Sequence, residues 1–439
     1  MLWQNTGLQE ASCMPAKYGG GDRMDIARPR YLEKLKDREF NGLVKIVTGV
    51  RRCGKSYLLF SIFYRYLVNK GIGADHIIQV DLERLENDAL RDPIALYNHI
   101  LSQITDDSPY YILIDEIQHV PRFSDVLNSL MHIRHADIYV TGSNSKLLSS
   151  DILTEFRGRG DEVRVYPLSF AEFCSVYDGA PQQAWLDYYT YGGMPGMMRL
   201  SKDSLKEQYL IRLFNETYLK DIIERHQLRL PADLDQLVNV LASAVGSLTN
   251  PKKLQDTFKT VKQSDVSYKT IASYIDCLKD AFLIEEAVRF DIKGRKYINS
   301  LSKYYYVDAG LRNARLNFRQ IEETHLMENV IYNELRMREF NVDIGIIETR
   351  ETMPDNSRIR KSLEIDFIAR KGREQYYIQS ALALPSAEKR AQEERPLLRV
   401  RDNFKKVIVV GTPARIQISE QGILTVNVLD FLLRDDILV

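Results

Sequence analysis

One eight-residue segment combines two glycines, a lysine and a hydroxyl side chain at a spacing typical of phosphate binding. Residues 49–56 read Gly-Val-Arg-Arg-Cys-Gly-Lys-Ser, which matches G-x-x-x-x-G-K-[ST]. Glycines let backbone N–H groups wrap around phosphates, Lys55 can neutralise the β- and γ-phosphate charge, and Ser56 can ligate Mg²⁺. The segment therefore predicts a site for ATP and Mg²⁺. The residues expected to contact the nucleotide are Gly49, Arg51, Arg52, Cys53, Gly54, Lys55, Ser56 and Tyr57.

A pair of carboxylates about sixty residues later strengthens this interpretation. An apolar run from Tyr110 to Ile114 ends in Asp115 and Glu116. Asp115 can hold Mg²⁺ through water, and Glu116 can polarise the attacking water. Taken alone, a buried strand that ends in two carboxylates is more often structural than catalytic. Taken alone, the glycine motif would occur by chance on the order of one or two times in a hundred in a chain of this length. Together, the two motifs favour a nucleotide site.

Two further segments offer polar side chains for the same chemistry. Ser143 and Asn144 follow an apolar run, at a position where a side chain can touch the γ-phosphate or the water; the alternative is an ordinary Gly-Ser-Asn turn. Arg159 lies in a Phe-Arg-Gly-Arg-Gly segment and can reach the γ-phosphate of a neighbouring subunit, stabilising charge in the transition state. A solvated loop arginine is the competing interpretation.

The elements that must position these residues alternate between short apolar runs and amphipathic stretches. This pattern predicts parallel strands with crossover helices, hence an α/β fold. We expect strands at 44–48, 77–81, 110–115, 138–141 and 162–166. Gly71 ends the helix that follows the loop. Beyond residue 170 helical patterns dominate, and strands return at 343–349, 362–369, 375–383 and 405–410.

Composition limits the other classes of protein. Sixty Lys plus Arg balance sixty Asp plus Glu, so any basic surface must be local. The four cysteines lack metal-type or paired spacing, which favours a reducing, cytoplasmic compartment. No apolar run approaches the roughly 18 residues that a membrane helix needs, so no membrane association is expected. Residues 1–23 are expected to be a flexible leader, native or an over-extended start.

With these motifs in view, the chain resembles a bacterial and archaeal family of AAA+ ATPases that carry a C-terminal domain of unknown function. The resemblance spans about residues 26–174 and includes Pro167-Leu-Ser-Phe-Ala-Glu-Phe173. It implies ATP and Mg²⁺ as ligands of Lys55, Ser56, Asp115 and Glu116. It also implies Asn144 as a sensor of the γ-phosphate and Arg159 as a candidate arginine finger.

Residues 265–308 suggest a winged helix. Ser267 can cap a helix whose apolar face includes Ile271 and Leu278, and a hairpin follows with a basic turn. In DNA-binding winged helices the helix enters a major groove and the basic tip contacts phosphate. Here the basic residues are Lys269, Lys293, Arg295 and Lys296. A winged helix that packs only against protein is an equally good interpretation.

The last domain resembles the restriction-endonuclease-like fold. Glu328 and Glu334 lie on a predicted helix, and Asp366 lies on a strand. The next strand carries Gln379-Ser-Ala381 where that fold has a (D/E)-x-K triplet, so one carboxylate and the lysine are missing. We therefore expect a nuclease fold without nuclease activity, whose carboxylates are surface or core residues.

The sequence thus predicts an α/β P-loop AAA+ domain with a parallel sheet, followed by a helical and winged-helix region and an α+β nuclease-like domain. The expected boundaries are 1–23 leader, 24–170 ATPase core, 171–232 helical region, 233–312 winged-helix-like domain and 313–439 C-terminal domain. The expected function is slow or partner-stimulated ATP hydrolysis that controls the accessory domains. A homo-oligomer is compatible with this function, and the sequence leaves the oligomeric state open. The alternatives are an ATP-switched regulator that binds double-stranded DNA and a metal-dependent nuclease.

Overall fold

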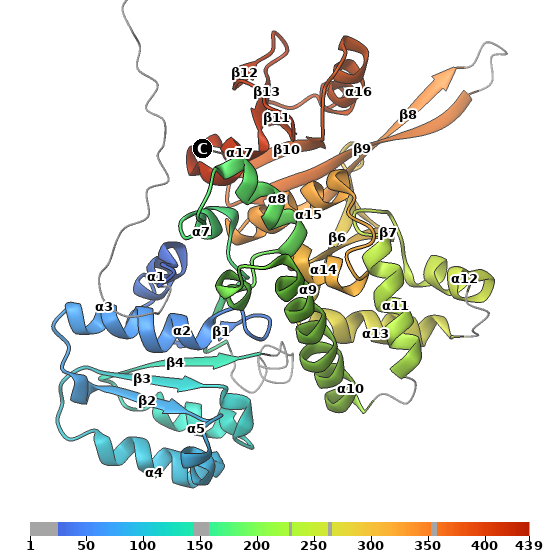
Figure 1. Ribbon diagram of the computed structural model, residues 1–439. Helices are drawn as coiled ribbons and strands as arrows, with labels where there is room; N and C mark the ends of the chain where they lie inside the picture. Colours follow the sequence, from blue (N-terminus) through green and yellow to red (C-terminus); the bar gives the residue numbers. More distant parts are fainter. Residues whose placement is uncertain (1–24, 144–157, 228–230, 262–265, 353–357, 439) are drawn as a thin grey trace, which may run out of the picture.

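The computed structural model describes residues 25–143, 158–227, 231–261, 266–352 and 358–438. The leader predicted at residues 1–23 lies outside these ranges. In Figure 1 the first α/β domain forms the lower left of the molecule, the last domain lies above it, and the intervening helices lie to the right. Within the described ranges, no helix is both long enough and apolar enough to span a membrane.

The first domain is built on a five-stranded parallel sheet with the order β2-β3-β4-β1-β5. The strands are β1 (Val44–Thr48), β2 (Ile77–Asp81), β3 (Tyr110–Asp115), β4 (Ala136–Gly142) and β5 (Gly160–Arg164). All five predicted strands are confirmed to within two residues at each end. The predicted α/β class of this domain is therefore confirmed.

Both faces of this sheet are buried, which explains why its strands are apolar without interruption. Alternate residues of β1 show the division: Val47 joins the core under α1 (Pro29–Lys36) and the helix that follows the loop, whereas Ile46 joins the core under α4 and α5. The helix after the loop runs continuously through α2 (Lys55–Tyr57), the π-helical η1 (Leu58–Phe63) and α3 (Tyr64–Asn69). On the other face lie α4 (Pro93–Gln103) and α5 (Phe123–Leu130).

The middle of the chain is helical up to residue 280. Its first helices are α7 (Phe170–Cys174), α8 (Pro181–Tyr191), α9 (Asp203–Arg212), the π-helical η7 (Leu213–Leu219) and α10 (Lys220–His226). They are followed by α11 (Pro231–Ser243), α12 (Pro251–Val261) and α13 (Tyr268–Asp280). As predicted, the Ser267 hydroxyl caps α13 by accepting from the Thr270 N–H, and a hairpin follows.

An eight-stranded mixed sheet forms the rest of the molecule, in the order β12-β13-β11-β10-β9-β8-β6-β7. Its strands are β6 (Ile284–Asp291), β7 (Lys296–Tyr306), β8 (Asn341–Thr352), β9 (Arg358–Lys371), β10 (Glu374–Ala381), β11 (Lys405–Val410), β12 (Gln417–Ile418) and β13 (Ile423–Asn427). The hairpin β6–β7 is part of this sheet, because β6 pairs in parallel with β8. The sheet therefore runs across residue 312, where the sequence predicts a domain boundary. The helices of this region are α14 (Ala309–Arg315), α15 (Glu323–Met337), α16 (Ala387–Leu398) and α17 (Val428–Leu433).

A buried carboxylate joins the two sheets. Glu285 of β6 accepts a hydrogen bond from the Tyr166 hydroxyl (2.6 Å) and pairs with Arg164 of β5 and Arg336 of α15, both at 2.8 Å. Burial raises the pKa of Glu285, but the charges of Arg164 and Arg336 outweigh it and hold the pKa below its ordinary value. The contact fixes the last strand of the first domain against the second sheet.

Replacing this carboxylate by an amide of the same shape tests the junction. We expect Glu285→Gln to lower the free energy of unfolding by about 3 kcal/mol, since two guanidiniums lose their shared anion. The neighbouring Glu286→Gln is the control: its pair with Lys279 is partly exposed, and we expect a loss below about 1 kcal/mol. Urea titrations of the native protein and the two variants measure the free energy of unfolding. Equal midpoints for the two variants would contradict the role of Glu285 at the junction between the sheets.

Candidate nucleotide site

The glycine loop lies where the sequence predicts, between the end of β1 and the start of α2. Its conformation depends on its two glycines. Gly49 has a φ of 139°, and a Cβ added there would lie 2.1 Å from the Val165 carbonyl oxygen; Gly54 has a φ of 103°. Both dihedral angles fall in the region that favours glycine, and the close approach at Gly49 excludes any larger residue. The required strand–loop–helix context is therefore present.

Lys55 folds back over this loop. Its side chain is only 4% exposed, and its ammonium donates to the carbonyl oxygens of Gly49 (3.1 Å) and Val50 (3.4 Å). Its counter-charge among the described residues is Glu116, with Nζ and Oε1 3.7 Å apart. A buried ammonium held mainly by neutral carbonyls is a favourable partner for an anion that reaches the loop.

The two predicted carboxylates face this lysine from the end of β3, and a threonine orients both. The Thr141 hydroxyl, at the end of β4, donates to Asp115 Oδ1 and accepts from the Glu116 backbone N–H at 2.9 Å. Because β4 lies between β3 and β1 in the sheet, Thr141 stands between the carboxylates and the loop. Glu116 also accepts from the Gln118 side-chain amide, and its φ of 51° ends the strand.

The environment of Asp115 suits a cation. Burial raises its pKa to about 6, while hydrogen bonds from Thr141 and Ser56 lower it. The oxygen donors Ser56 and Asp115 are ligand types that Mg²⁺ prefers. No cluster of three or more His, Cys, Asp or Glu arranged for a metal occurs among the described residues. The site therefore fits an ion that takes its remaining ligands from phosphates and water.

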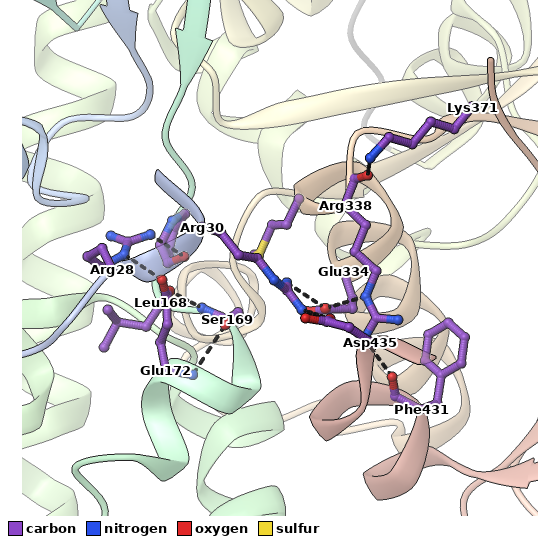
Figure 2. Close-up of polar contacts among 12 residues, drawn as sticks. Arg28, Arg30, Leu168, Ser169, Glu172, Glu334, Arg338, Lys371, Phe431 and Asp435 are labelled. Carbon is purple, nitrogen blue, oxygen red and sulfur yellow. Dashed lines mark hydrogen bonds and ion pairs between the residues drawn. The ribbon is translucent and has the colours of Figure 1, made fainter. Parts of the chain in front are cut away.

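An arginine outside the loop holds it in place. The guanidinium of Arg28, 3% exposed, donates to the carbonyls of Cys53 (3.0 Å) and Tyr166 (2.8 Å) and pairs with Glu172 at 2.9 Å. Glu172 in turn forms a capping box with Ser169 at the start of α7, as Figure 2 shows. From the other side, the Tyr218 hydroxyl of η7 donates to the Arg51 carbonyl at 2.8 Å. Two side chains from outside the loop thus fix its backbone, at the Cys53 and Arg51 carbonyls.

A cavity of about 310 Å³ opens beside the loop at Gly54. It is large enough for a small planar group, and its wall combines apolar and aromatic side chains with an arginine. These include Ile26, Tyr57, Leu168, Pro195, Arg199 and Tyr209. The wall therefore joins the segment before α1, the loop helix and the helical region.

The other predicted contact residues lie as follows. Arg51 pairs with Asp221 of α10 at 3.2 Å, and the Tyr57 hydroxyl donates to Asp25. The Cys53 side chain is fully buried and points to the Val165 carbonyl, so only its backbone can face a ligand. Arg52 lines the cavity.

Of the candidates between β4 and β5, Ser143 and Arg159 lie within the described residues. Asn144 lies outside the described ranges. Ser143 is buried, and its hydroxyl has no hydrogen-bond partner among the residues that the structure describes. Arg159 contacts Asn128 of α5 at 3.3 Å, and its carbonyl bonds to Val44 at the start of β1. That is the opposite end of β1 from the loop, roughly 16 Å away along the strand.

The sequence reasoning missed Thr141, Arg28 and Tyr218. Thr141 is a β-branched residue in an apolar strand, and only its position one strand away from Asp115 gives it a role. Arg28 carries a local signal, since it precedes Pro29 at a helix start, but its partner Glu172 is 144 residues away.

Comparison with known families agrees with this geometry. Residues 41–174 match the family model of an AAA domain, and residues 182–322 match a domain of unknown function (DUF8612). An uncharacterized protein of Haemophilus influenzae is 34% identical over 416 residues, covering 93% of this chain and 99% of the relative. An uncharacterized protein of Methanocaldococcus jannaschii is 29% identical over 338 residues, covering 74% and 71%.

Two solved structures illustrate the more distant similarities. The Aeropyrum pernix Orc1 protein in complex with DNA is 13% identical, with a TM-score of 0.31 over 66% of this chain and 92% of that chain. Cdc6 of Pyrobaculum aerophilum is 12% identical, with a TM-score of 0.29 over 70% and 96%. TM-scores this low support no conclusion about this chain.

The loop, the paired carboxylates and the family match define the first third of the molecule as a P-loop AAA domain of the nucleotide-binding kind. The chain as a whole belongs to the same family as the Haemophilus influenzae protein.

The position of Thr141 leads to a prediction about nucleotide binding. In Thr141→Val the Glu116 N–H loses its acceptor and Asp115 loses a donor, so we expect Mg²⁺-dependent affinity for ATP to fall about tenfold, or roughly 1.4 kcal/mol. Thr141→Ser keeps the hydroxyl and is expected to remain within threefold of the native protein. Titration with a fluorescent ATP analogue measures both; equal losses in the two variants would point to packing instead.

Proposed function

We propose that this protein binds ATP with Mg²⁺, hydrolyses it, and uses its nucleotide state to control the domains that follow. The observation that carries the proposal is the meeting of Lys55, Asp115 and Glu116 around one loop, with Thr141 orienting both carboxylates. The cavity beside Gly54 offers room for the nucleobase next to the loop. A cytoplasmic location is proposed as well, because the four cysteines of the sequence lack paired or metal-type spacing.

Each residue has a distinct role in this proposal. The loop amides and Lys55 bind the β- and γ-phosphates, and Ser56 and Asp115 hold Mg²⁺. When bound, Mg²⁺ supplies positive charge that offsets the charge developing on the phosphates. Glu116 orients the attacking water and accepts its proton, a role that its hydrogen bond from Gln118 and its fixed backbone favour.

Turnover in this proposal is slow or depends on a neighbouring subunit. Arg159 directly precedes β5, at the end of the sheet away from its own loop, so its finger role requires a second copy of the chain. Asn144 is proposed as the sensor of the γ-phosphate.

Two substitutions separate binding from hydrolysis. We expect Lys55→Ala to weaken ATP binding about 100-fold or more, since a buried charged donor to the phosphates is lost. Glu116→Gln keeps the shape of the side chain but cannot accept the proton; we expect ATP affinity within fivefold of the native protein and phosphate release reduced at least about 100-fold. Calorimetry and a phosphate-release assay measure the two effects. Tight ATP binding by the Lys55 variant would contradict the proposed nucleotide site.

The route from the nucleotide site to the C-terminal domain runs through the segment that starts α1. Two residues after Arg28, Arg30 pairs with Glu334 of α15 at 2.8 Å and with Asp435. Glu334 also accepts from Arg338 (2.7 Å), whose guanidinium donates to the Phe431 carbonyl of α17 at 2.7 Å. Figure 2 shows this network beside the Arg28 contacts. A shift of the loop that moves Arg28 is therefore transmitted to α15 and α17.

Removing the Arg30 link tests this coupling. We expect ATP to change hydrogen exchange of α15 in the native protein, and we expect Arg30→Gln to reduce that change at least twofold while ATP affinity stays within threefold. The control is Lys36→Gln in the same helix. Lys36 forms an exposed ion pair with Glu33, and the variant is expected to behave as native. Undiminished α15 protection in Arg30→Gln would show that the coupling takes another path.

A DNA-binding regulator switched by ATP is the second candidate function. The exposed basic turn between β6 and β7, with Lys293, Arg295 and Lys296, supports it, together with the capped helix α13. In this proposal the hairpin acts as the wing of a winged helix and α13 faces the groove.

The nuclease-like character of the C-terminal domain remains a proposal, and we propose that it is inactive. Lys303 of β7 is buried and pairs with Glu328 and Glu364, both at 2.8 Å, and lies 3.8 Å from Asp366. Lys303 lies on β7, whereas the lysine of the (D/E)-x-K triplet would lie on β10. Its ammonium offsets the negative charge of the carboxylates around it. Gln379 still occupies the position where the nuclease fold has a carboxylate.

A further inference from the structure

The short 3₁₀ turn η4 (Ile117–His119) begins directly after Glu116 and carries Gln118. The Gln118 side-chain amide donates from Nε2 to Oε2 of Glu116. The main chain of Glu116 is held at the same point, because its N–H donates to the Thr141 hydroxyl at 2.9 Å. Gln118 therefore orients the carboxylate of a residue whose backbone is already fixed.

The two carboxylate oxygens of Glu116 have different neighbours. Oε1 lies 3.7 Å from the Lys55 ammonium, whereas Oε2 accepts from the Gln118 amide. Lys55 belongs to the phosphate side of the site, since its ammonium also donates to the carbonyls of Gly49 and Val50. An ionised carboxylate has about four lone-pair sites, so Oε2 can accept from one more donor beside Gln118.

The oxygen of the same amide group lacks a donor. Gln118 Oε1 is buried and accepts no hydrogen bond from the residues that the structure describes. Amide bond lengths place it about 2.2 Å from Nε2, so it lies next to the carboxylate that Nε2 contacts. Exchanging the amide nitrogen and oxygen would set two acceptors against each other, so the bond to Glu116 fixes the orientation. A buried acceptor without a donor costs about 1 to 3 kcal/mol, which favours a donor that arrives there.

We propose that Gln118 is a positioning residue that, together with Glu116, holds the attacking water for ATP hydrolysis. A water between the two side chains donates one hydrogen to Glu116 Oε2 and the other to Gln118 Oε1. Both hydrogens then point at the protein, so a lone pair of the water oxygen is left for the γ-phosphate. A glutamine side chain orients the attacking water in other P-loop enzymes as well. The inference rests on the proposed function and adds a second side chain to it.

The two side chains have different parts in the reaction. The water oxygen forms a bond to the γ-phosphorus while the bond from that phosphorus to the bridging oxygen breaks, and ADP keeps the electron pair. The hydrogen that faces Glu116 passes to its carboxylate as a proton, and inorganic phosphate is the second product. The hydrogen that faces Gln118 stays on the water oxygen, because a neutral amide oxygen is too weak a base to take it. Loss of Gln118 therefore acts on turnover and leaves nucleotide binding in place.

The substitution Gln118→Met tests this role, because methionine has a similar length but neither a donor nor a strong acceptor. We expect kcat for ATP hydrolysis to fall about 30-fold while affinity for ATP with Mg²⁺ stays within threefold of the native protein. A phosphate-release assay and calorimetry on the full chain measure the two quantities. The matched control is Gln103→Met in α4, where the glutamine is exposed and contacts His99; we expect native kcat and affinity.

A double variant distinguishes positioning of the water from a structural role. If both side chains act on one water, Gln118→Met lowers single-turnover hydrolysis by less than about threefold in a protein that already carries Glu116→Gln. We also expect the urea midpoint of Gln118→Met to show a protein that is fully folded under the assay conditions. The same 30-fold loss in the Glu116→Gln background would assign Gln118 to structure and overturn the inference.

Two other results for the single variant also overturn it. A kcat that rises would show that Gln118 restrains Glu116, and a kcat within threefold of the native value would show that Gln118 has no part in turnover. In both cases ATP binding and native hydrolysis stand, so the proposed function survives. A native protein that does not hydrolyse ATP would instead overturn the proposed function, and this inference with it.

Discussion

The candidate nucleotide site depends on the backbone of the glycine loop, residues 49–56, which is held in place by groups outside the loop. Gly49 can approach Val165 only because it lacks a side chain, and the carbonyls of Cys53 and Arg51 are fixed by Arg28 and Tyr218. Those partners come from two separate parts of the chain, the segment before α1 and η7. A preformed loop loses little entropy when it binds an anion, because its amides are already aimed inward. The lysine and carboxylates act from fixed positions for the same reason.

The anchoring residues also tie distant parts of the chain to that loop. Arg28 reaches α7 through Glu172, and Arg30 reaches α15 and α17 through Glu334 and Arg338. Buried ion pairs of this kind contribute less to net stability than their number suggests, because desolvation offsets much of the attraction. Their effect here is to specify position: a guanidinium with three fixed acceptors tolerates only one placement of its neighbours.

The sequence predicted those features that depend on residues close together in the chain. Apolar runs gave the five strands, and the glycine loop and Asp115–Glu116 pair were readable because each motif is contiguous. Thr141 and Arg28 were missed because their partners belong to other strands and helices. The eight-stranded sheet was missed for the same reason: nothing in the β6 sequence indicates pairing with β8, and a hairpin after a capped helix is equally typical of a winged helix. The roles of Asn144 and Arg159 stay predictions.

The pairing of β6 with β8 has a consequence for how the chain is made. Strand β8 begins at Asn341, fifty residues after β6 ends at Asp291. On a ribosome that adds about 5 to 20 residues each second, the open edge of β6 waits several seconds for its neighbour. During that interval the unpaired edge of β6 is open to pairing with other chains, which charged residues beside an edge strand disfavour.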